Sequence, residues 1–280
     1  MTTSKRSATR KRFTARTADK YELYQLAVQS AEHDVKLAAR IFKKLRGREA
    51  LSMREDFCGT AQLSAEWVKL GAQHTADGYD LDPEPLAWGR EHNLAPLGEA
   101  AQRVTLHQGD VREASKRKHD LRLAQNFSWW VFKDRPTLLD YCKRVRKDLA
   151  TDGMFLMDIY GGLEAPEEMV EKRPIDAGFT YLWEQALYLP GSAEYRCHIS
   201  FKFKDGTQLK RAFTYEWRLW TLPEVKDVLR EAGFRDVQSW FEGTDHSSKE
   251  LSGSGIYYRD DKGKLGRDCA GWLAYAVALK

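Results

Sequence analysis

Residues 53–64 read MREDFCGTAQLS and place two acids, a thiol and a glycine within five positions. A strand that ends in charge and a tight turn could hold a dinucleotide, a redox-active cysteine or a sulfonium cofactor. A dinucleotide needs the bare backbone of G-x-G-x-x-G, but only Gly59 stands in this turn, and the ring of Phe57 would crowd a diphosphate. Cys58 sits near a helix N-terminus, which favours a thiolate, but no second cysteine lies nearby. These residues alone leave the choice open.

Three more polar residues follow short apolar runs further along the chain. Asp80 ends the run in GYDLDPEPL, Asp110 ends RVTLHQGD, and Asn126 ends DLRLAQN. A carboxylate has two acceptor oxygens that match two adjacent hydroxyl donors, such as those of a ribose. Taken singly, Asp80 and Asp110 could equally be helix caps.

The elements that must position these residues alternate regularly. Strand-like runs end at the sites above and at Tyr160, and helical patterns cover residues 60–70, 83–93 and 136–149. Between residues 21 and 45 apolar residues recur at helical spacing, and Ser30 can cap the helix that they predict, with Glu32 in its first turn. Strands that alternate with helices predict an α/β fold, in which a doubly wound, mostly parallel sheet has helices on both faces. The carboxyl ends of its strands meet at one edge, where ligands of such folds bind.

The alternation of strands with helices stops between residues 163 and 220. Three long runs in this stretch alternate with period two. Two of them, CHISFKFKDG and RAFTYEWRL, flank a tight Asp205-Gly206 turn, which predicts hairpins of a half-buried antiparallel sheet. The parallel pattern resumes at Thr221, which forms a capping box with Glu224 at the start of a helix. Two more strands are expected after it, FRDVQSWF and GWLAYAVAL, separated by a loop that contains the serine- and glycine-rich residues 252–255. We therefore expect a basic, flexible arm over residues 1–20, a Rossmann-like domain over 21–162 and 221–280, and an inserted β subdomain over 163–220.

Together these markers resemble the Rossmann-like (class I) methyltransferases that use S-adenosylmethionine. Residues 55–61, EDFCGTA, stand where that family has an acid and a small-residue turn close to G-C-G-T-G. The resemblance covers about residues 45–160 and 221–280 and implies a seven-stranded sheet, S-adenosyl-L-methionine as cofactor and S-adenosyl-L-homocysteine as product. It implies that Asp80 binds the ribose and that Asp110 accepts from adenine, next to the amide of Val111. The cofactor-binding residues expected in this way are Arg54, Glu55, Phe57, Cys58, Gly59, Asp80, Leu81, Asp110, Val111 and Asn126.

The chain departs from the family pattern at three positions. Phe57 and Ala61 stand where glycines are frequent, so the amino-acid end of the cofactor is expected to sit differently. Arg122 lies in the middle of the fourth strand, where an interior parallel strand favours an apolar residue. Only pairing with an acid would account for Arg122.

The sequence gives fewer signals for the binding site of the methyl acceptor than for that of the cofactor. Residues 126–129, NFSW, keep an amide and an aromatic residue but lack the two prolines usual in DNA amino-methyltransferases, which lowers the case for a nucleobase acceptor. The insertion resembles the lids of small-molecule N- and O-methyltransferases, and a lid excludes water from the reacting pair. We expect Asn126, Tyr160, Glu184 and Arg218 to position a small-molecule acceptor.

The composition of the chain restricts which other classes of protein it could belong to. No run approaches the roughly 18 apolar residues of a membrane helix, and the basic N-terminus has no apolar core of a secretory signal. The four cysteines are dispersed, which disfavours a zinc site and fits reduced thiols in the cytoplasm. The alternatives to a small-molecule enzyme are an RNA- or nucleotide-modifying methyltransferase guided by the basic arm, and a non-catalytic cofactor-binding scaffold. A homodimer remains open.

Overall fold

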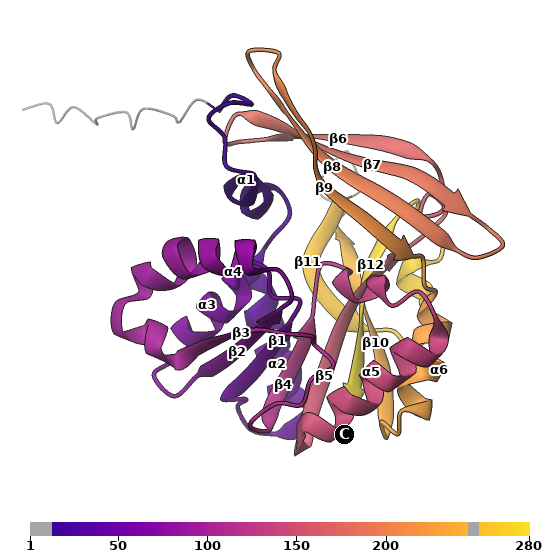
Figure 1. Cartoon of the computed structure of the whole chain (residues 1–280). Helices are drawn as coiled ribbons and strands as arrows, with labels where there is room; N and C mark the ends of the chain where they lie inside the picture. Colours follow the sequence, from indigo (N-terminus) through magenta and orange to yellow (C-terminus); the bar gives the residue numbers. More distant parts are fainter. Residues whose placement is uncertain (1–12, 246–251) are drawn as a thin grey trace, which may run out of the picture.

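The computed structural model describes residues 13–245 and 252–280. Figure 1 shows a large sheet flanked by helices, with a second, four-stranded sheet above one of its edges. The expected fold class, an α/β sheet with helices on both faces and an inserted antiparallel sheet, is confirmed. No helix in these ranges is long and apolar enough to cross a membrane.

The large sheet has eight strands. Their order across the sheet is β11 (Ser252–Arg259), β10 (Asp236–Asp245), β12 (Trp272–Leu279), β5 (Leu149–Gly161), β4 (His119–Ala124), β1 (Ser52–Asp56), β2 (Thr75–Asp80) and β3 (Val104–Gln108). Strands β5, β4, β1, β2 and β3 are parallel, and β12, β10 and β11 pair antiparallel. The sheet has one strand more than expected, because β11 occupies a serine- and glycine-rich stretch whose composition favoured a loop.

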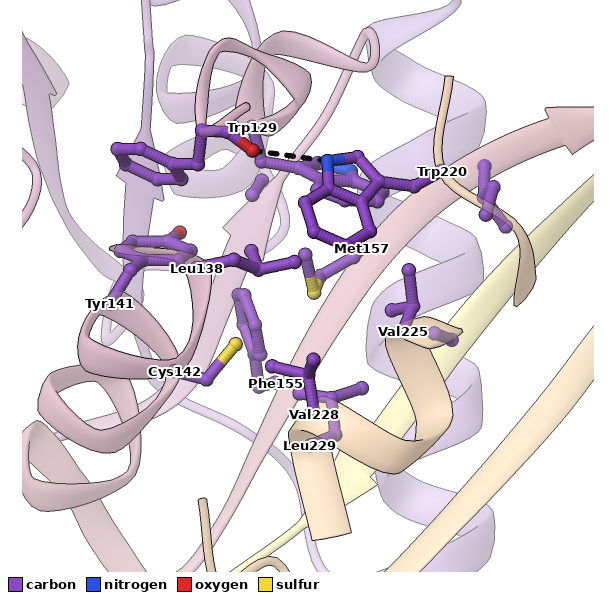
Figure 2. Close-up of a cluster of buried hydrophobic side chains, with 14 of the residues drawn as sticks. Trp129, Leu138, Tyr141, Cys142, Phe155, Met157, Trp220, Val225, Val228 and Leu229 are labelled. Carbon is purple, nitrogen blue, oxygen red and sulfur yellow. Dashed lines mark hydrogen bonds between the residues drawn. The ribbon is translucent and has the colours of Figure 1, made fainter. Parts of the chain in front are cut away.

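Helices cover both faces of this sheet. The apolar sides of α2 (Ala31–Arg46) and α3 (Gln62–Lys69) form one buried cluster with the strands, and those of α5 (Arg135–Asp148) and α6 (Leu222–Glu231) form another. Figure 2 shows part of the second cluster, where α5 and α6 meet β5. The capping box of Thr221 and Glu224 is present as predicted. The shorter helices are α4 (Pro83–Gly89), η1 (Arg90–Leu94), η2 (Ala95–Arg103), η3 (Ser128–Val131) and η4 (Lys264–Gly266).

The second sheet, here called the inserted sheet, is the meander β6 (Met169–Ile175), β7 (Phe179–Leu189), β8 (Glu194–Phe203) and β9 (Gln208–Arg218). The predicted turn at Asp205-Gly206 is confirmed, with Gly206 at a φ of 85°. Three strand runs were predicted, but the sheet has four strands. Strand β6 was missed because it is mostly exposed and so lacks an alternating apolar pattern.

The N-terminal segment differs from its prediction. Two helices, α1 (Lys20–Ala27) and α2, occupy the stretch in which one helix was expected. Ser30 is the N-cap residue of α2, as predicted, but its side chain makes no capping bond. Residues 13–20 were expected to be part of a flexible arm, but Phe13 is only 6% exposed and packs edge-on against Phe179 of the inserted sheet. The rest of the predicted arm, residues 1–12, lies outside the described residues.

Candidate active site

The turn after β1 is held in an uncommon conformation. Phe57, Gly59 and Ala61 all have positive φ values of 57°, 51° and 56°, and left-handed backbone at a side-chain-bearing residue is disfavoured. The turn therefore keeps the backbone conformation that glycine adopts most easily, although two of its positions carry side chains. A Cβ added at Gly59 would meet no atom within 4 Å, so the turn exposes bare backbone to open space.

Phe57 does not obstruct this open side. Its ring packs into the core, with its centre 5.8 Å from that of Phe132 and 6.2 Å from that of Tyr141. No atom of Phe57 lies within 4 Å of a Cβ built at Gly59. The crowding expected from the sequence is thus absent on the open side of the turn.

Asp80 links the ends of the first two strands. One carboxylate oxygen accepts from the Gly59 amide at 2.7 Å, and the other accepts from the Asp82 amide at 2.9 Å. Burial raises the pKa of Asp80. The side chain is only half-buried, and the neighbouring Leu81 is 66% exposed. The two motifs read from the sequence therefore meet at the carboxyl edge of the sheet.

Glu55, the acid of the first motif, lies beneath the turn. It is 3% exposed, and one carboxylate oxygen accepts from the Ser64 amide at 2.9 Å and from its hydroxyl at 2.5 Å. Burial raises the pKa of Glu55 to about 8. The carboxyl group thus ties β1 to α3 and shapes the turn from within the protein.

This raised pKa predicts a pH dependence of stability. Between about pH 4.5 and 8 the folded protein keeps a proton on Glu55 that the unfolded chain releases, so the free energy of unfolding falls as the pH rises through this window. Glu55→Gln removes that titration and keeps an acceptor for Ser64, so we expect a flatter decline. Urea unfolding of both proteins at pH 5, 6.5 and 8 measures the difference, and equal slopes would contradict the prediction. A residual decline is expected from Asp158, whose pKa burial also raises to about 8.

Cys58 is not an activated thiol. It is 2% exposed, and burial, reinforced by the nearby carboxylates of Glu55 and Asp80, raises its pKa well above the ordinary value. A nucleophilic cysteine requires the opposite shift. The redox interpretation of the turn is therefore disfavoured.

Arg54 does not face the open turn, contrary to expectation. It is fully buried, its Nε donates to Asp56 at 2.8 Å, and its other nitrogens donate to Val111, Glu113 and Ser115. Its place in the sequence, next to the first motif, was the reason to expect Arg54 in the cofactor site. Its side chain stabilises the protein interior through these hydrogen bonds.

The same network explains Arg122. Its Nε donates to Asp56 at 2.6 Å, and Arg122 lies beside Arg54 on neighbouring strands β4 and β1. Asp56 also accepts from the Tyr141 hydroxyl at 2.6 Å, and Asp148 lies 3.5 Å from Arg122. The two arginines and two aspartates balance in charge, which is what allows an interior strand to hold an arginine.

The end of β3 holds Asp110 and Val111. The Asp110 carboxylate accepts from Arg112 through its amide and guanidinium, which lowers the pKa of Asp110. The side chain of Val111 is buried, and its carbonyl accepts from Arg54 and Arg122. Any contact of Asp110 with adenine must therefore share the carboxylate with Arg112.

The end of β4 makes a second strained turn. Asn126 and Phe127 are consecutive residues with φ values of 57°. The Phe127 amide donates to the Asp158 carboxylate at 3.0 Å, and the Phe127 ring lies edge-on to Tyr160 at 4.7 Å. Two left-handed residues in succession are rare away from functional sites.

Helix α1 was not assigned to the site from the sequence, yet it contacts the first turn. Gln25 donates to the Thr60 hydroxyl at 2.8 Å, and Asp19, which caps α1, accepts from the Trp88 indole at 3.0 Å. Figure 1 shows α1 between the inserted sheet and the edge of the large sheet. The signal that could have found its start is Asp19, a good cap directly before an amphipathic stretch.

A cavity of about 570 Å³ lies between the inserted sheet and the carboxyl edge of the large sheet. Asn126, Phe127 and Tyr160 line it from the large sheet, and Tyr160 donates to the Tyr195 hydroxyl at 2.8 Å. Aromatic rings from α1 and the inserted sheet form much of the wall: Tyr24, Tyr181, Trp183, Tyr215 and Trp217. Its charged lining residues are Glu164, Glu171, Arg173 and Glu242. The cavity is thus aromatic, with more acids than bases.

Glu184 and Arg218 do not line this cavity, and their predicted role is therefore not supported. Each alternates with the cavity-lining aromatic residues along its strand and so points to the other face of the inserted sheet. Arg218 instead donates to Glu224 at 2.8 Å and lies over the Trp220 ring. The polar face, with Glu184 and Arg218, was expected to meet the acceptor, but the aromatic face meets the cavity.

A strained turn, the half-exposed Asp80 carboxylate and the inserted sheet thus share one edge of a Rossmann-like α/β sheet, the architecture of the class I methyltransferase fold. Comparison with solved structures confirms that fold, and two of the three structures described next are methyltransferases by their descriptions. No protein-family model matches the sequence, and no curated protein matches it.

Three solved structures illustrate the likeness. The S-adenosylmethionine-bound amino pentose methyltransferase CalS10 of Micromonospora echinaspora is 15% identical, with a TM-score of 0.64 over 92% of this chain and 97% of that one. DesVI of Streptomyces venezuelae is 18% identical, with a TM-score of 0.65 over 92% and 96%. The sugar N-methyltransferase KedS8 of a Streptoalloteichus species is 15% identical, with a TM-score of 0.62 over 100% and 98%. At these identities the likeness establishes the fold.

Proposed function

We propose that the protein is an S-adenosylmethionine-dependent methyltransferase that methylates a nitrogen atom of a small amine, of the amino-sugar type. The observation that carries the proposal is the meeting of two sites at one sheet edge. The open backbone at Gly59 and the half-exposed carboxylate of Asp80 lie 2.7 Å apart, and Asn126 of the same edge lines the aromatic cavity. Such an arrangement suits a cofactor that must present one reactive group to an enclosed acceptor.

The residues present fit this cofactor. Gly59 leaves room for close approach, and Asp80 offers two acceptor oxygens for two adjacent hydroxyls. In this proposal Leu81 and Asp110 border the nucleoside, the Val111 amide faces adenine, and Asn126 marks the methyl-donating end. Glu55, Phe57 and Cys58 shape the turn from below, and Arg54 supports it from the core.

When bound, S-adenosylmethionine supplies an already activated methyl group, so the protein chiefly aligns the acceptor with it and excludes water. The inserted sheet and α1 cover the cavity and perform the exclusion. Tyr160, fixed by its bond to Tyr195, is the side chain best placed to orient the acceptor. The aromatic and acidic lining suits the ammonium form of an amine, since aromatic faces attract cations. The nitrogen accepts a methyl group only as the neutral amine, so the ammonium proton must first leave to solvent, and the methylated ammonium product is again a cation.

Two observations support an amine as the methyl acceptor. CalS10 and KedS8 are described as amino pentose and sugar N-methyltransferases, and the cavity of this protein carries three glutamates against one arginine. The nucleic-acid alternative rests on residues 1–12, which lie outside the described residues, and it stays a prediction, as does the homodimer.

Calorimetry with S-adenosylhomocysteine, followed by transfer of labelled methyl to a panel of amino sugars, small amines and hydroxyl analogues, tests the proposal. Absence of S-adenosylhomocysteine binding would contradict it, and turnover of hydroxyl analogues alone would contradict the amine assignment.

Trp183→Ala should impair acceptor binding selectively. Trp183 lies in the aromatic wall, with its ring 6.3 Å from that of Trp217, and its loss removes both contact area and a cation-attracting face. We expect the acceptor KM to rise about tenfold, equivalent to about 1.4 kcal/mol, while S-adenosylhomocysteine affinity stays within about twofold. The matched control is Glu184→Ala, the next residue on the opposite face, which should change neither. Equal effects of the two substitutions would contradict the assignment of the aromatic face to the acceptor.

A further inference from the structure

Asp158 of β5 makes hydrogen bonds to the segment after β4 through both its side chain and its main chain. The Asp158 carboxylate accepts from the Phe127 amide at 3.0 Å and also interacts with the Asn126 amide. Its backbone carbonyl accepts from the Trp129 indole at 2.8 Å, and Trp129 is fully buried. Both the side chain and the main chain of Asp158 therefore hold residues 126–129.

This segment needs such support. Left-handed backbone at two consecutive residues with side chains is disfavoured and persists only where surrounding bonds impose it. Amide donors that point at one buried acceptor provide that constraint, because another conformation would leave a 5% exposed carboxyl group without partners. Asn126 and Phe127 in turn line the acceptor cavity next to Tyr160.

We propose that Asp158 is a positioning residue that holds the turn at residues 126–127 and so sets the place of Asn126 between the cofactor site and the acceptor cavity. This inference rests on the proposed methyltransferase function for its catalytic consequence. Asp158 acts through the turn and takes no proton from the acceptor. Burial raises its pKa to about 8, so near neutral pH the side chain is largely a neutral acid with one acceptor and one donor oxygen. Asparagine has the same pattern of acceptor and donor.

Two variants separate positioning from proton transfer. Asp158→Asn keeps an acceptor for Phe127 and should retain kcat within about threefold. Asp158→Ala releases the turn and should lower kcat roughly a hundredfold, the scale expected when reacting groups are misplaced by about 1 Å. S-adenosylhomocysteine affinity should stay within about threefold in both. The matched control is Asp120→Ala, which removes a carboxylate that accepts from the Leu51 and Ser52 amides at the other end of the strands and should leave kcat unchanged.

The experiment measures kcat with the best amine of the panel, S-adenosylhomocysteine affinity by calorimetry, and hydrogen exchange of the Phe127 amide in each full-length protein. Faster exchange in Asp158→Ala but not in Asp158→Asn, together with the kcat pattern above, supports the inference. Unchanged exchange in Asp158→Ala overturns it, and so does a loss of kcat in Asp158→Asn as large as in Asp158→Ala. Failure of the wild type to turn over any acceptor contradicts the proposed function instead, and the exchange result then still decides whether Asp158 holds the turn.

Discussion

Asp80→Ala is expected to lower S-adenosylhomocysteine affinity by at least about a hundredfold, or about 3 kcal/mol. The wild-type carboxylate can accept from both ribose hydroxyls, and hydrogen bonds to a charged group contribute about 1.5–3 kcal/mol each. The substitution also frees the Gly59 amide, which loses its 2.7 Å bond, so the turn loses its link to β2. Isothermal titration calorimetry on the purified protein measures the change.

Asp82→Ala is the matched control. Asp82 caps α4 by accepting from the Glu84 amide at 2.9 Å and is exposed, so its removal should cost about 1 kcal/mol of stability and leave the affinity nearly unchanged. Asp80→Asn should fall between the wild type and Asp80→Ala, because the amide keeps one acceptor. Wild-type affinity in a folded Asp80→Ala protein would remove Asp80 from the site and weaken the proposed function.

Asp56→Ala should destabilise the fold severely. Arg54 and Arg122 are no more than 1% exposed, and both direct their Nε atoms at this carboxylate. Removing one partner of a buried ion network leaves charges uncompensated, which costs about 3–5 kcal/mol. That is a large part of the roughly 5–15 kcal/mol by which a protein is stable. Urea unfolding at neutral pH should show the loss as a lower midpoint.

Asp152→Ala provides the comparison at the surface. Asp152 also pairs with an arginine, Arg48, at 2.7 Å, but the two side chains are 45% and 40% exposed. Water screens such a pair, so its loss should cost less than about 1 kcal/mol. If Asp56→Ala cost as little as Asp152→Ala, the buried network would not be the support of β1 and β4 inferred from the structure.

The sequence alone was sufficient for the local elements and for the order of the markers. Period-two alternation located three of the four strands of the inserted sheet, and Thr221 and Glu224 marked the start of α6. The succession of Glu55, Asp80 and Asn126 at strand ends predicted the parallel sheet and its ligand-binding edge. Such signals are readable because they depend on neighbours only a few residues apart.

Other features depended on which strands became neighbours. Arg54 seemed to belong to the cofactor site and Arg122 seemed out of place, because the sequence does not show that β1 and β4 lie side by side around Asp56. Strand β11 was missed because its composition resembles a loop, and its pairing with β10 supplies the hydrogen bonds that make it a strand.

The wall of the acceptor cavity is another feature that the sequence alone could not predict. Alternation along the strands separated an aromatic face from a polar face, but it could not tell which face would meet the large sheet. The structure directs the aromatic face, with Trp183 and Trp217, at the cavity and leaves Glu184 on the other side. The sequence by itself determined the fold class, the inserted sheet and the order of the motifs, because hydrophobic period and turn chemistry are local. Only the tertiary structure decided which acids face the site and which are used in the core, because that depends on contacts between residues far apart in the chain.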